Sequence, residues 1–560
     1  MGNMDILHSL GWTFRKRCAE RQLLLAILAL FSVGDVFAFE WRLRPNLSMS
    51  EIFSDNLNLN NKDQKGGFVT EVVPGLSLYG QSPWSNFNLN YRLQGLYNAG
   101  GGEAFDVNHQ LNMNTRYQMI RNTLFVDSSS SISQQNLSNA FIATDNISGP
   151  DNRTETKTFN ISPYWTPRFG SFATGLLRLG YSRVSFDNSQ SGFQRSNLPA
   201  SLNDFALITD TETYTKQANL SSGRYFNTIS WQFGYSATDN NRASGNDANF
   251  ESYNGDIRYY FNQKFNIFAQ GGYANNQFQS VTNSSKNGLY YTFGGQWRPS
   301  RFYSIEAGAG NNQHVTLQFN PSANLTSTIT YMNKDVGLNR GSSWNAAFNY
   351  KLSQATWGFT YSQDTTTVQQ LLMDRLSILK DPLGNPIGQF PIDPSTGRPI
   401  IDISQLSPEQ MKLVFNPYNS FDLYSLPNLV DDVVVTKRGN LSFGYQTGKS
   451  HFNANAFNER RTYQQSALQD NVYGISGGWQ WQMAPRLSFF LQPMWQSTSG
   501  LADNTRYDVA LGLNRPFPIN LGRPLVANTR LEFRHIEQVS DSSDFDYTEN
   551  RATANFAVQF

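Results

Sequence analysis

Apolar and polar side chains alternate at every second position along most of this 560-residue chain. Leu89, Tyr91 and Leu93 are separated by Asn90 and Arg92, and the same pattern recurs in many other segments. A period of two places the two sets of side chains on opposite faces of a β-strand. The chain is therefore predicted to be all-β, with one apolar and one polar face on each strand.

Two architectures fit such strands, a soluble sandwich or propeller and a transmembrane antiparallel up-and-down β-barrel. Many alternating runs last about 10–14 residues, whereas soluble strands usually have about 5–6 and membrane-crossing strands about 9–11. Aromatic residues also cluster at the ends of runs, as in "YWTPRF" and "QWRPSRFY", where an interfacial girdle belongs. Both features favour the barrel.

Short and long connections alternate along the chain, which is the rule for periplasmic turns and external loops in bacterial barrels. Ten short turns, such as "FNQK" and "TGKS", join twenty strands. One further strand at each end gives about 22, within a range of 20–24, because 313–340 has room for another hairpin. Both chain ends then lie on the periplasmic side.

Composition agrees with a barrel in the cell outer membrane. Only 39% of residues are hydrophobic and 16% are charged, yet 14% are aromatic. Such a chain is too polar for a large core and too aromatic for disorder. The net charge of +1 indicates no nucleic-acid partner.

The first 38 residues are predicted to be a secretory signal peptide. Basic residues at 15–21 precede the apolar run 23–33, and Val36-Phe37-Ala38 fits a cleavage site. An N-terminal anchor helix is the alternative, but the run is short for a bilayer. The barrel would occupy 39–560, and the single cysteine, Cys18, would be removed with the signal.

The last strand carries a predicted assembly signal. Phe556, Val558 and Phe560 alternate with polar residues up to the final position. This ending resembles the signal that the barrel-assembly machinery reads on outer-membrane proteins. The last strand must also pair with the first, because an open edge in lipid is not tolerated.

Two stretches, "LSMSEIFSDNLNL" and "GFVTEVVPGLSL", resemble the N-terminal hairpin of the PEP-CTERM system-associated outer-membrane β-barrel family. Ser54-Asp55-Asn56, Thr70-Glu71 and Pro74-Gly75 carry the match, and "SSWNAAFNYKLSQATWGFTYSQDTTT" and "YTENRATANF" are also similar. The resemblance implies a context of exosortase and exopolysaccharide genes and no catalytic residues.

Many charged residues fall on the polar faces of the predicted strands. Arginine is costly on a lipid face, so these residues are expected to line the lumen. They could form an electrostatic filter for anions, or internal ion pairs that brace the wall. The lumen-lining candidates are Arg92, Arg116, Arg178, Arg258, Arg298, Arg506, Arg530, Glu532, Arg534 and Arg551.

The segment 368–430 interrupts the alternation and is predicted to be a long irregular loop. It contains the apolar "LLMDRLSILK", and Ser407-Pro408-Glu409-Gln410 has the pattern of a helix start. A loop of this length usually has a function of its own. It would either fold into the lumen as a constriction or lie outside as a partner surface.

Few residues of the sequence suggest a catalytic, metal or ligand site. No His spacing fits a metal site, so no metal or cofactor is expected. His535 with Glu537 is the nearest candidate for an outer-membrane hydrolase, against the more ordinary interpretation as a rim histidine. Asp-Asn recurs seven times, as at Asp55 and Asp145, and indicates either turn chemistry or cation or sugar binding.

The leading functional hypothesis is a non-enzymatic porin-like channel or export-associated pore. The alternatives are a non-conducting outer-membrane scaffold, an outer-membrane hydrolase, and a gated receptor-transporter. The last needs an N-terminal plug domain, whereas strands here begin almost at Phe39. Expected partners are outer-membrane lipid and the barrel-assembly machinery, with polysaccharide or other export-system components as further candidates.

Overall fold

The computed structural model describes eleven stretches of the chain. The predicted signal peptide and most of 368–430, including the predicted helix start at Ser407, lie outside them. The described residues are 40–99, 105–136, 142–149, 153–187, 209–243, 247–280, 284–377, 432–500, 503–520, 524–541 and 545–560.

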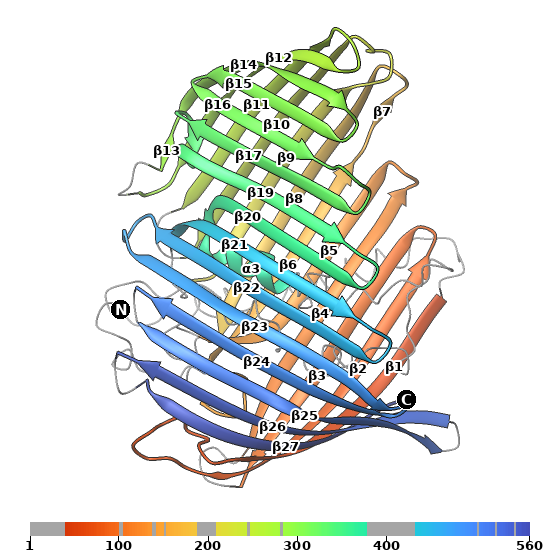
Figure 1. Cartoon of the computed structure of the whole chain (residues 1–560), viewed down its shortest axis with the longest axis vertical. Helices are drawn as coiled ribbons and strands as arrows, with labels where there is room; N and C mark the ends of the chain where they lie inside the picture. The colour runs from red at the N-terminus through yellow and green to blue at the C-terminus, as the bar shows by residue number, and fades with distance from the viewer. Residues whose placement is uncertain are drawn as a thin grey trace, which may run out of the picture.

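The described residues form one closed antiparallel barrel, in which each wall strand pairs with its neighbours in chain order and β1 pairs with both β2 and β27 (Figure 1). Its 24 wall strands are β1 (Glu40–Ser54), β2 (Gly67–Ser82), β3 (Ser85–Asn98), β4 (Phe105–Ile120), β5 (Leu124–Asn136), β6 (Arg153–Trp165), β8 (Ala173–Asp187), β9 (Thr211–Ser222), β10 (Ile229–Arg242), β11 (Ala248–Tyr260), β12 (Phe265–Gln277), β14 (Gly288–Ser300), β15 (Tyr303–Gly310), β16 (Asn312–Phe319), β17 (Leu325–Lys334), β19 (Gly341–Lys351), β20 (Ala355–Thr367), β21 (Val433–Gln446), β22 (Ser450–Tyr463), β23 (Gln469–Ala484), β24 (Leu487–Ser499), β25 (Asn504–Asn520), β26 (Pro524–Ser540) and β27 (Tyr547–Gln559).

Three two-residue strands accompany the wall. β7 (Arg168–Phe169) pairs with β8 in the wall sheet, and β13 (Ser285–Lys286) and β18 (Gly337–Leu338) form a separate two-stranded sheet. One helix, α3 (Val368–Ser377), is present in the described residues. Within them, no helix has the length and apolar character needed to cross a membrane.

The barrel confirms the predicted fold class, with a strand number at the upper end of the predicted range. The additional pair is the hairpin of β16 and β17, which lies where 313–340 left room for it. The count stays even, so β1 begins and β27 ends at the same rim, the one that carries the short turns.

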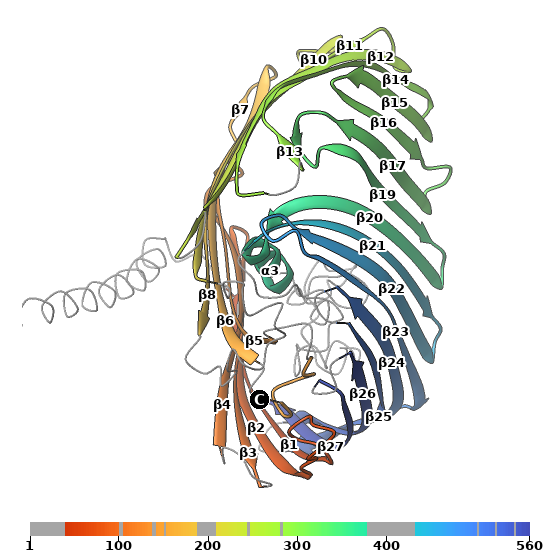
Figure 2. The ribbon, with the colours of Figure 1, turned by 90° about the vertical axis from the view of Figure 1, so that its left-hand side faces the viewer.

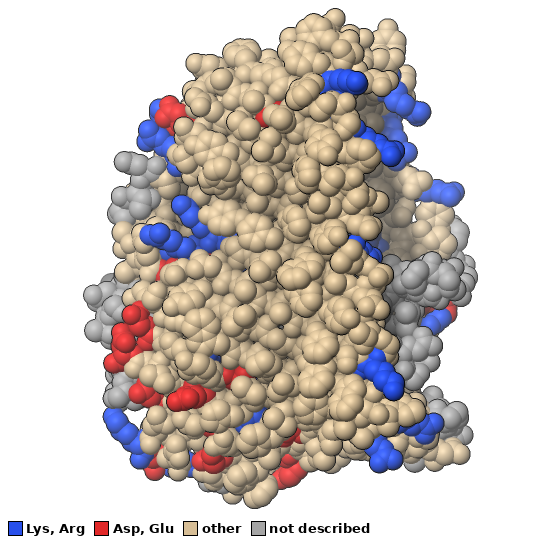
Figure 3. Space-filling model, in the orientation of Figure 1, with Lys and Arg blue, Asp and Glu red and all other residues tan. Residues whose placement is uncertain are grey.

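The two faces of each strand differ as the alternation predicts. On β25 and β26, Tyr507, Leu531 and Phe533 are 46%, 57% and 47% exposed. Their sequence neighbours Arg506 and Arg534 are only 0% and 8% exposed. The outward side chains include many large hydrophobic residues, and the space-filling view shows a surface that is largely free of charged groups (Figure 3). A closed wall with an apolar exterior is the architecture of an outer-membrane barrel.

Pairing of the first and last strands closes the wall. Nine residue pairs join β1 to β27, from Asn46 with Gln559 to Ser54 with Arg551. Beyond this ladder, the amide nitrogen of Phe560 donates to the carbonyl oxygen of Pro45 at 2.9 Å. The terminal residue of the predicted assembly signal thus takes part in closure.

Candidate functional site in the barrel lumen

Residues 142–149, which we call the lumen loop, lie between β5 and β6 and pack against the inner face of β25–β27 and β1. Ala143 shares an apolar cluster with Ile536 and Tyr547, and Ile147 packs on a second cluster around Ile52. The wall residues of both clusters are distant from the loop in sequence but contact it in the closed barrel. The lumen loop therefore covers part of the inner wall.

Polar contacts from Arg506 fix the start of the lumen loop. Its guanidinium donates to the carbonyl oxygen of Ile142 and to the hydroxyl of Thr144. The hydroxyl of Tyr547 donates to the same Ile142 carbonyl at 2.6 Å. Asp508, 3.2 Å from the Arg506 Nη2, balances the charge. Since Arg506 and Tyr547 are almost fully buried, these contacts are shielded from water.

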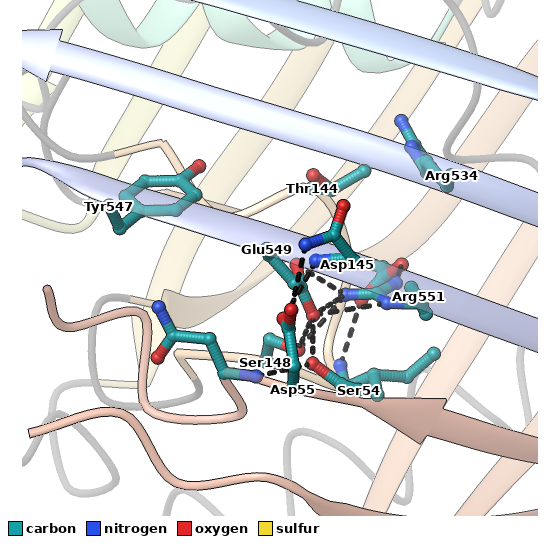
Figure 4. A network of polar contacts seen from close by, with 12 residues as sticks. Ser54, Asp55, Thr144, Asp145, Ser148, Arg534, Tyr547, Glu549 and Arg551 are labelled. Atoms are coloured by element: carbon teal, nitrogen blue, oxygen red, sulfur yellow. Dashed lines mark hydrogen bonds and ion pairs between the residues drawn. The ribbon is translucent and has the colours of Figure 1, made fainter.

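Arg551 fixes the end of the lumen loop (Figure 4). It forms ion pairs with Asp145 of the loop and with Glu549 of its own strand, and its Nη2 lies 2.9 Å from Ser148 Oγ. Glu549 Oε1 also accepts from Ser148 at 2.6 Å and from Ser54 at 2.7 Å. One arginine thus links the loop to β27, and its carboxylate partner links it to β1.

The charges around Asp145 hold it in its ionised form. Burial alone would raise the pKa of Asp145, but the positive charges of Arg551 and Arg534 and the hydrogen bond from Ile147 N lower it below its ordinary value. Arg534 itself binds Asp508, with Nη2 to Oδ2 at 2.6 Å. The loop is therefore docked by ionised groups that neutralise one another.

The helix α3 forms the second part of the site and lies between opposite sides of the wall (Figure 2). Val368 and Leu372, both 0% exposed, pack against Val184 of β8 on one side and Val434 of β21 on the other. Thr367 caps the helix, since its Oγ1 accepts from Gln370 N at 3.2 Å. The segment predicted to be irregular at 368–377 is helical.

The two ends of the long 368–432 connection are held together. Val368 N donates to the carbonyl oxygen of Asp432 at 3.1 Å, and Thr367 pairs with Val433 in the ladder. The carboxylate of Asp432 accepts from Gln465 N at 2.9 Å in the β22–β23 turn. The connection therefore enters and leaves the wall at one point, beside α3.

The other predicted lumen residues are mostly in ion pairs. Arg116 and Arg178 approach Asp127 at 2.8 Å and 3.9 Å, and Arg258 binds Asp256 and Glu306. Arg530 pairs with Glu532, Arg92 is half-buried on β3, and Arg298 is exposed near the β14–β15 turn. This arrangement favours wall bracing over a continuous anion filter, because carboxylates accompany most of the arginines.

Arg116 and Arg178 are the exception in charge balance. Two guanidinium groups share one carboxylate there, and the Arg116 side chain is 61% exposed. The ring of Tyr164 lies 4.3 Å from the Arg178 guanidinium carbon. This patch on β4, β6 and β8 carries an accessible positive charge.

The contacts of His535 do not build the hydrolase pair considered from the sequence. Its Nδ1 lies 2.7 Å from Asn550 Oδ1, and Asn550 is held by both carboxylate oxygens of Asp55 at 2.7 Å. An amide and not the carboxylate of Glu537 therefore orients the imidazole. Among the described residues, no group of three or more His, Cys, Asp or Glu side chains could hold a metal ion.

Comparison with known proteins adds little to this picture. No family model and no curated protein matches the chain. Among solved structures, the siderophore receptor PirA from Pseudomonas aeruginosa is similar over 93% of this chain and 80% of its own, with 11% identity and a TM-score of 0.38. The FrpB iron transporter from Neisseria meningitidis (F3-3 variant) is similar over 92% and 81%, with 10% identity and a TM-score of 0.41. At these values, the ligands of those proteins do not indicate a ligand for this chain.

Proposed function

We propose that this protein is a non-enzymatic outer-membrane pore for polar solutes or a polymer strand, constricted by α3 and the lumen loop. The proposal rests chiefly on α3, which packs between β8 and β21 inside the barrel. Barrels of 16–18 strands already enclose an aqueous channel. A 24-stranded wall therefore encloses a wide lumen, and segments that fill part of it control what passes.

The resemblance to the PEP-CTERM system-associated family supports a narrower proposal, that the pore serves exopolysaccharide export. A neutral polysaccharide strand would suit a wall whose arginines are largely neutralised by neighbouring carboxylates. Partner components of an export system and the barrel-assembly machinery belong to the same proposal.

A permanently closed scaffold is the second candidate, and one observation favours it. The lumen loop is docked through ion pairs whose side chains are at most 15% exposed. Breaking a buried pair by removing one partner costs about 3–5 kcal/mol. A loop held this firmly does not open spontaneously as a gate, so transport would have to pass beside it.

Conductance in planar bilayers tests the proposal. Because Thr367 and Val433 are paired in the ladder, a two-residue Asn-Gly turn can replace 368–432 without moving β20 or β21. We expect small or flickering currents from the native barrel and larger, steady currents from the shortened one. Equal currents from the two would show that α3 does not constrict the pore, and silence from both would favour the scaffold.

A matched control keeps both the length of the connection and the contacts of α3 inside the barrel. Replacing 378–431 by a Gly-Ser linker of equal length retains α3 and its packing on β8 and β21. If α3 itself is the constriction, this variant keeps the native conductance. If the current rises as much as in the shortened barrel, the constriction lies within 378–431.

A further inference from the structure

Positive charge is distributed unevenly between the two rims of the barrel. The short-turn rim contains eleven turns that join wall strands, and none of the segments between those strands contains Asp or Glu. Eight of the turns have an exposed Lys or Arg within or beside them. These residues are Arg121, Arg168, Arg224, Lys264, Arg301, Lys351, Lys449 and Arg486.

Basic side chains at the opposite rim are arranged differently. Lys286 and Arg340 both pair with Asp335, at 2.8 Å and 3.3 Å, and Lys65 lies 3.9 Å from Asp63. In contrast, none of the eight short-turn residues takes part in an ion pair with another described residue. In the space-filling view, the charged groups along the edge with the short turns are mostly Lys and Arg, whereas the other edge shows Asp and Glu together with Lys and Arg (Figure 3).

Aromatic rings lie beside several of these basic residues. The guanidinium carbon of Arg121 is 5.0 Å from the ring centre of Trp84, and that of Arg301 is 4.8 Å from Phe302. Tyr225, next to Arg224, is 72% exposed. Aromatic rings of this kind occupy the interface between the hydrocarbon core and the lipid headgroups. The basic side chains beside them are therefore at headgroup depth.

We propose that the short-turn rim is a binding belt for anionic phospholipid headgroups of the periplasmic leaflet. The phosphate and glycerol headgroup is the ligand, and the unpaired Lys and Arg side chains supply its counter-charges. The belt runs around most of the circumference, from β4 to β24, as the boundary lipids do. A single protein partner would need a charged patch on only one sector of the rim.

Lipid selectivity at the barrel surface tests this proposal directly. The native barrel is placed in phosphatidylcholine nanodiscs that contain a minor fraction of phosphatidylglycerol, and spin-labelled lipids report the relative association constant of the two. One basic side chain near a headgroup favours an anionic lipid by about fivefold. We expect a severalfold preference for phosphatidylglycerol, which 1 M salt abolishes because the Debye length falls to about 3 Å.

Two variants with equal loss of charge separate the rims. The rim variant is R121Q/R224Q/K264Q/R301Q/R486Q, and the control variant is K65Q/K157Q/K216Q/K286Q/R340Q, whose residues all pair with an acidic side chain. Since all ten side chains are on the surface, both variants are expected to fold, and a heat-modifiable gel shift checks this.

The rim variant should lose the preference for phosphatidylglycerol, and the control variant should keep it. A native barrel without any preference would overturn the proposal. So would a rim variant that retains the preference, or a barrel that captures a soluble polyanion while it ignores phosphatidylglycerol. None of these outcomes depends on whether the pore conducts.

Discussion

Replacing Arg551 by Met removes the cation that neutralises Glu549 and Asp145 while keeping a side chain of similar length. The Arg551 and Glu549 side chains are 4% and 1% exposed, so the two carboxylates would be left without their main counter-charge in a site closed to water. Loss of one partner of a buried ion pair costs about 3–5 kcal/mol. Because Ser54 and Ser148 still donate to Glu549, we expect the lower end, about 3 kcal/mol.

This cost falls on the docked state of the lumen loop, since Arg551 meets Asp145 and Ser148 only there. Each 1.36 kcal/mol changes an equilibrium tenfold, so about 3 kcal/mol raises the undocked fraction roughly a hundredfold. Labelling of an Ala143→Cys thiol with a maleimide measures that fraction, because Ala143 is 1% exposed when the loop is docked. We expect a labelling rate about a hundred times that of the same cysteine in the native background.

Arg530→Met is the matched control. Arg530 is also an inward arginine, but its partner Glu532 belongs to its own strand and neither residue contacts the lumen loop. Its labelling rate should equal the native one. If Arg551→Met also labels at the native rate while the barrel remains folded, the ion pairs of Arg551 do not hold the loop.

Four further outcomes follow from the structure. Leu372→Ala should loosen α3 by about 2–5 kcal/mol and raise single-channel noise, because the side chain is fully buried between two walls; unchanged noise would count against the constriction. Phe560→Lys should lower the yield of heat-modifiable barrel more than Gln559→Lys, because Phe560 lies on the lipid-facing register and Gln559 on the other; equal yields would refute this. Since the pKa of Asp145 is lowered in the fold, its contribution to loop docking is complete above its unfolded pKa and is lost as pH falls through the lowered value. The hydrogen-exchange rate of the lumen loop, corrected for intrinsic rates, should therefore be constant from about pH 8 to 5 and increase only below about pH 4. Arg116→Gln should shift ion selectivity toward cations at low salt, because this exposed arginine belongs to a patch with one excess positive charge, and an unchanged reversal potential would contradict that role.

Local patterns were enough to predict the wall. Alternation assigns a face to each residue without any knowledge of its neighbours, and the apolar face on β25 and β26 is indeed the exposed one. Turn length then gave the topology and the common rim of the two chain ends. Both features depend on residues close together in the chain, which is why the sequence revealed them.

The hairpin of β16 and β17 shows the limit of this reasoning. Its two strands have 8 and 10 residues, and only Asn311 separates β16 from β15. A connection of one residue does not resemble an external loop, so the alternation of short and long links fails at this point. Residues 313–340 have room for an extra hairpin, but no local feature of the sequence requires one.

The contents of the lumen could not be predicted from the chain alone. Arg551 and Asp145 are 406 positions apart, and the polar face of β27 does not say which anion meets its arginine. Asp145 performs the turn role expected of Asp-Asn, since its Oδ1 accepts from Ile147 N at 3.0 Å, and it also forms the ion pair. Only the closed barrel brings the lumen loop and the last strand together.

The position of α3 is the claim on which the constricted pore depends, and cross-linking tests it most directly. A Leu372→Cys substitution is combined with Val184→Cys on β8 or with Val434→Cys on β21, and each pair is treated with a short bis-maleimide. We expect efficient cross-links in both pairs, because all three residues belong to one buried cluster inside the barrel. A folded barrel in which neither pair cross-links would place α3 outside the lumen and refute the constriction.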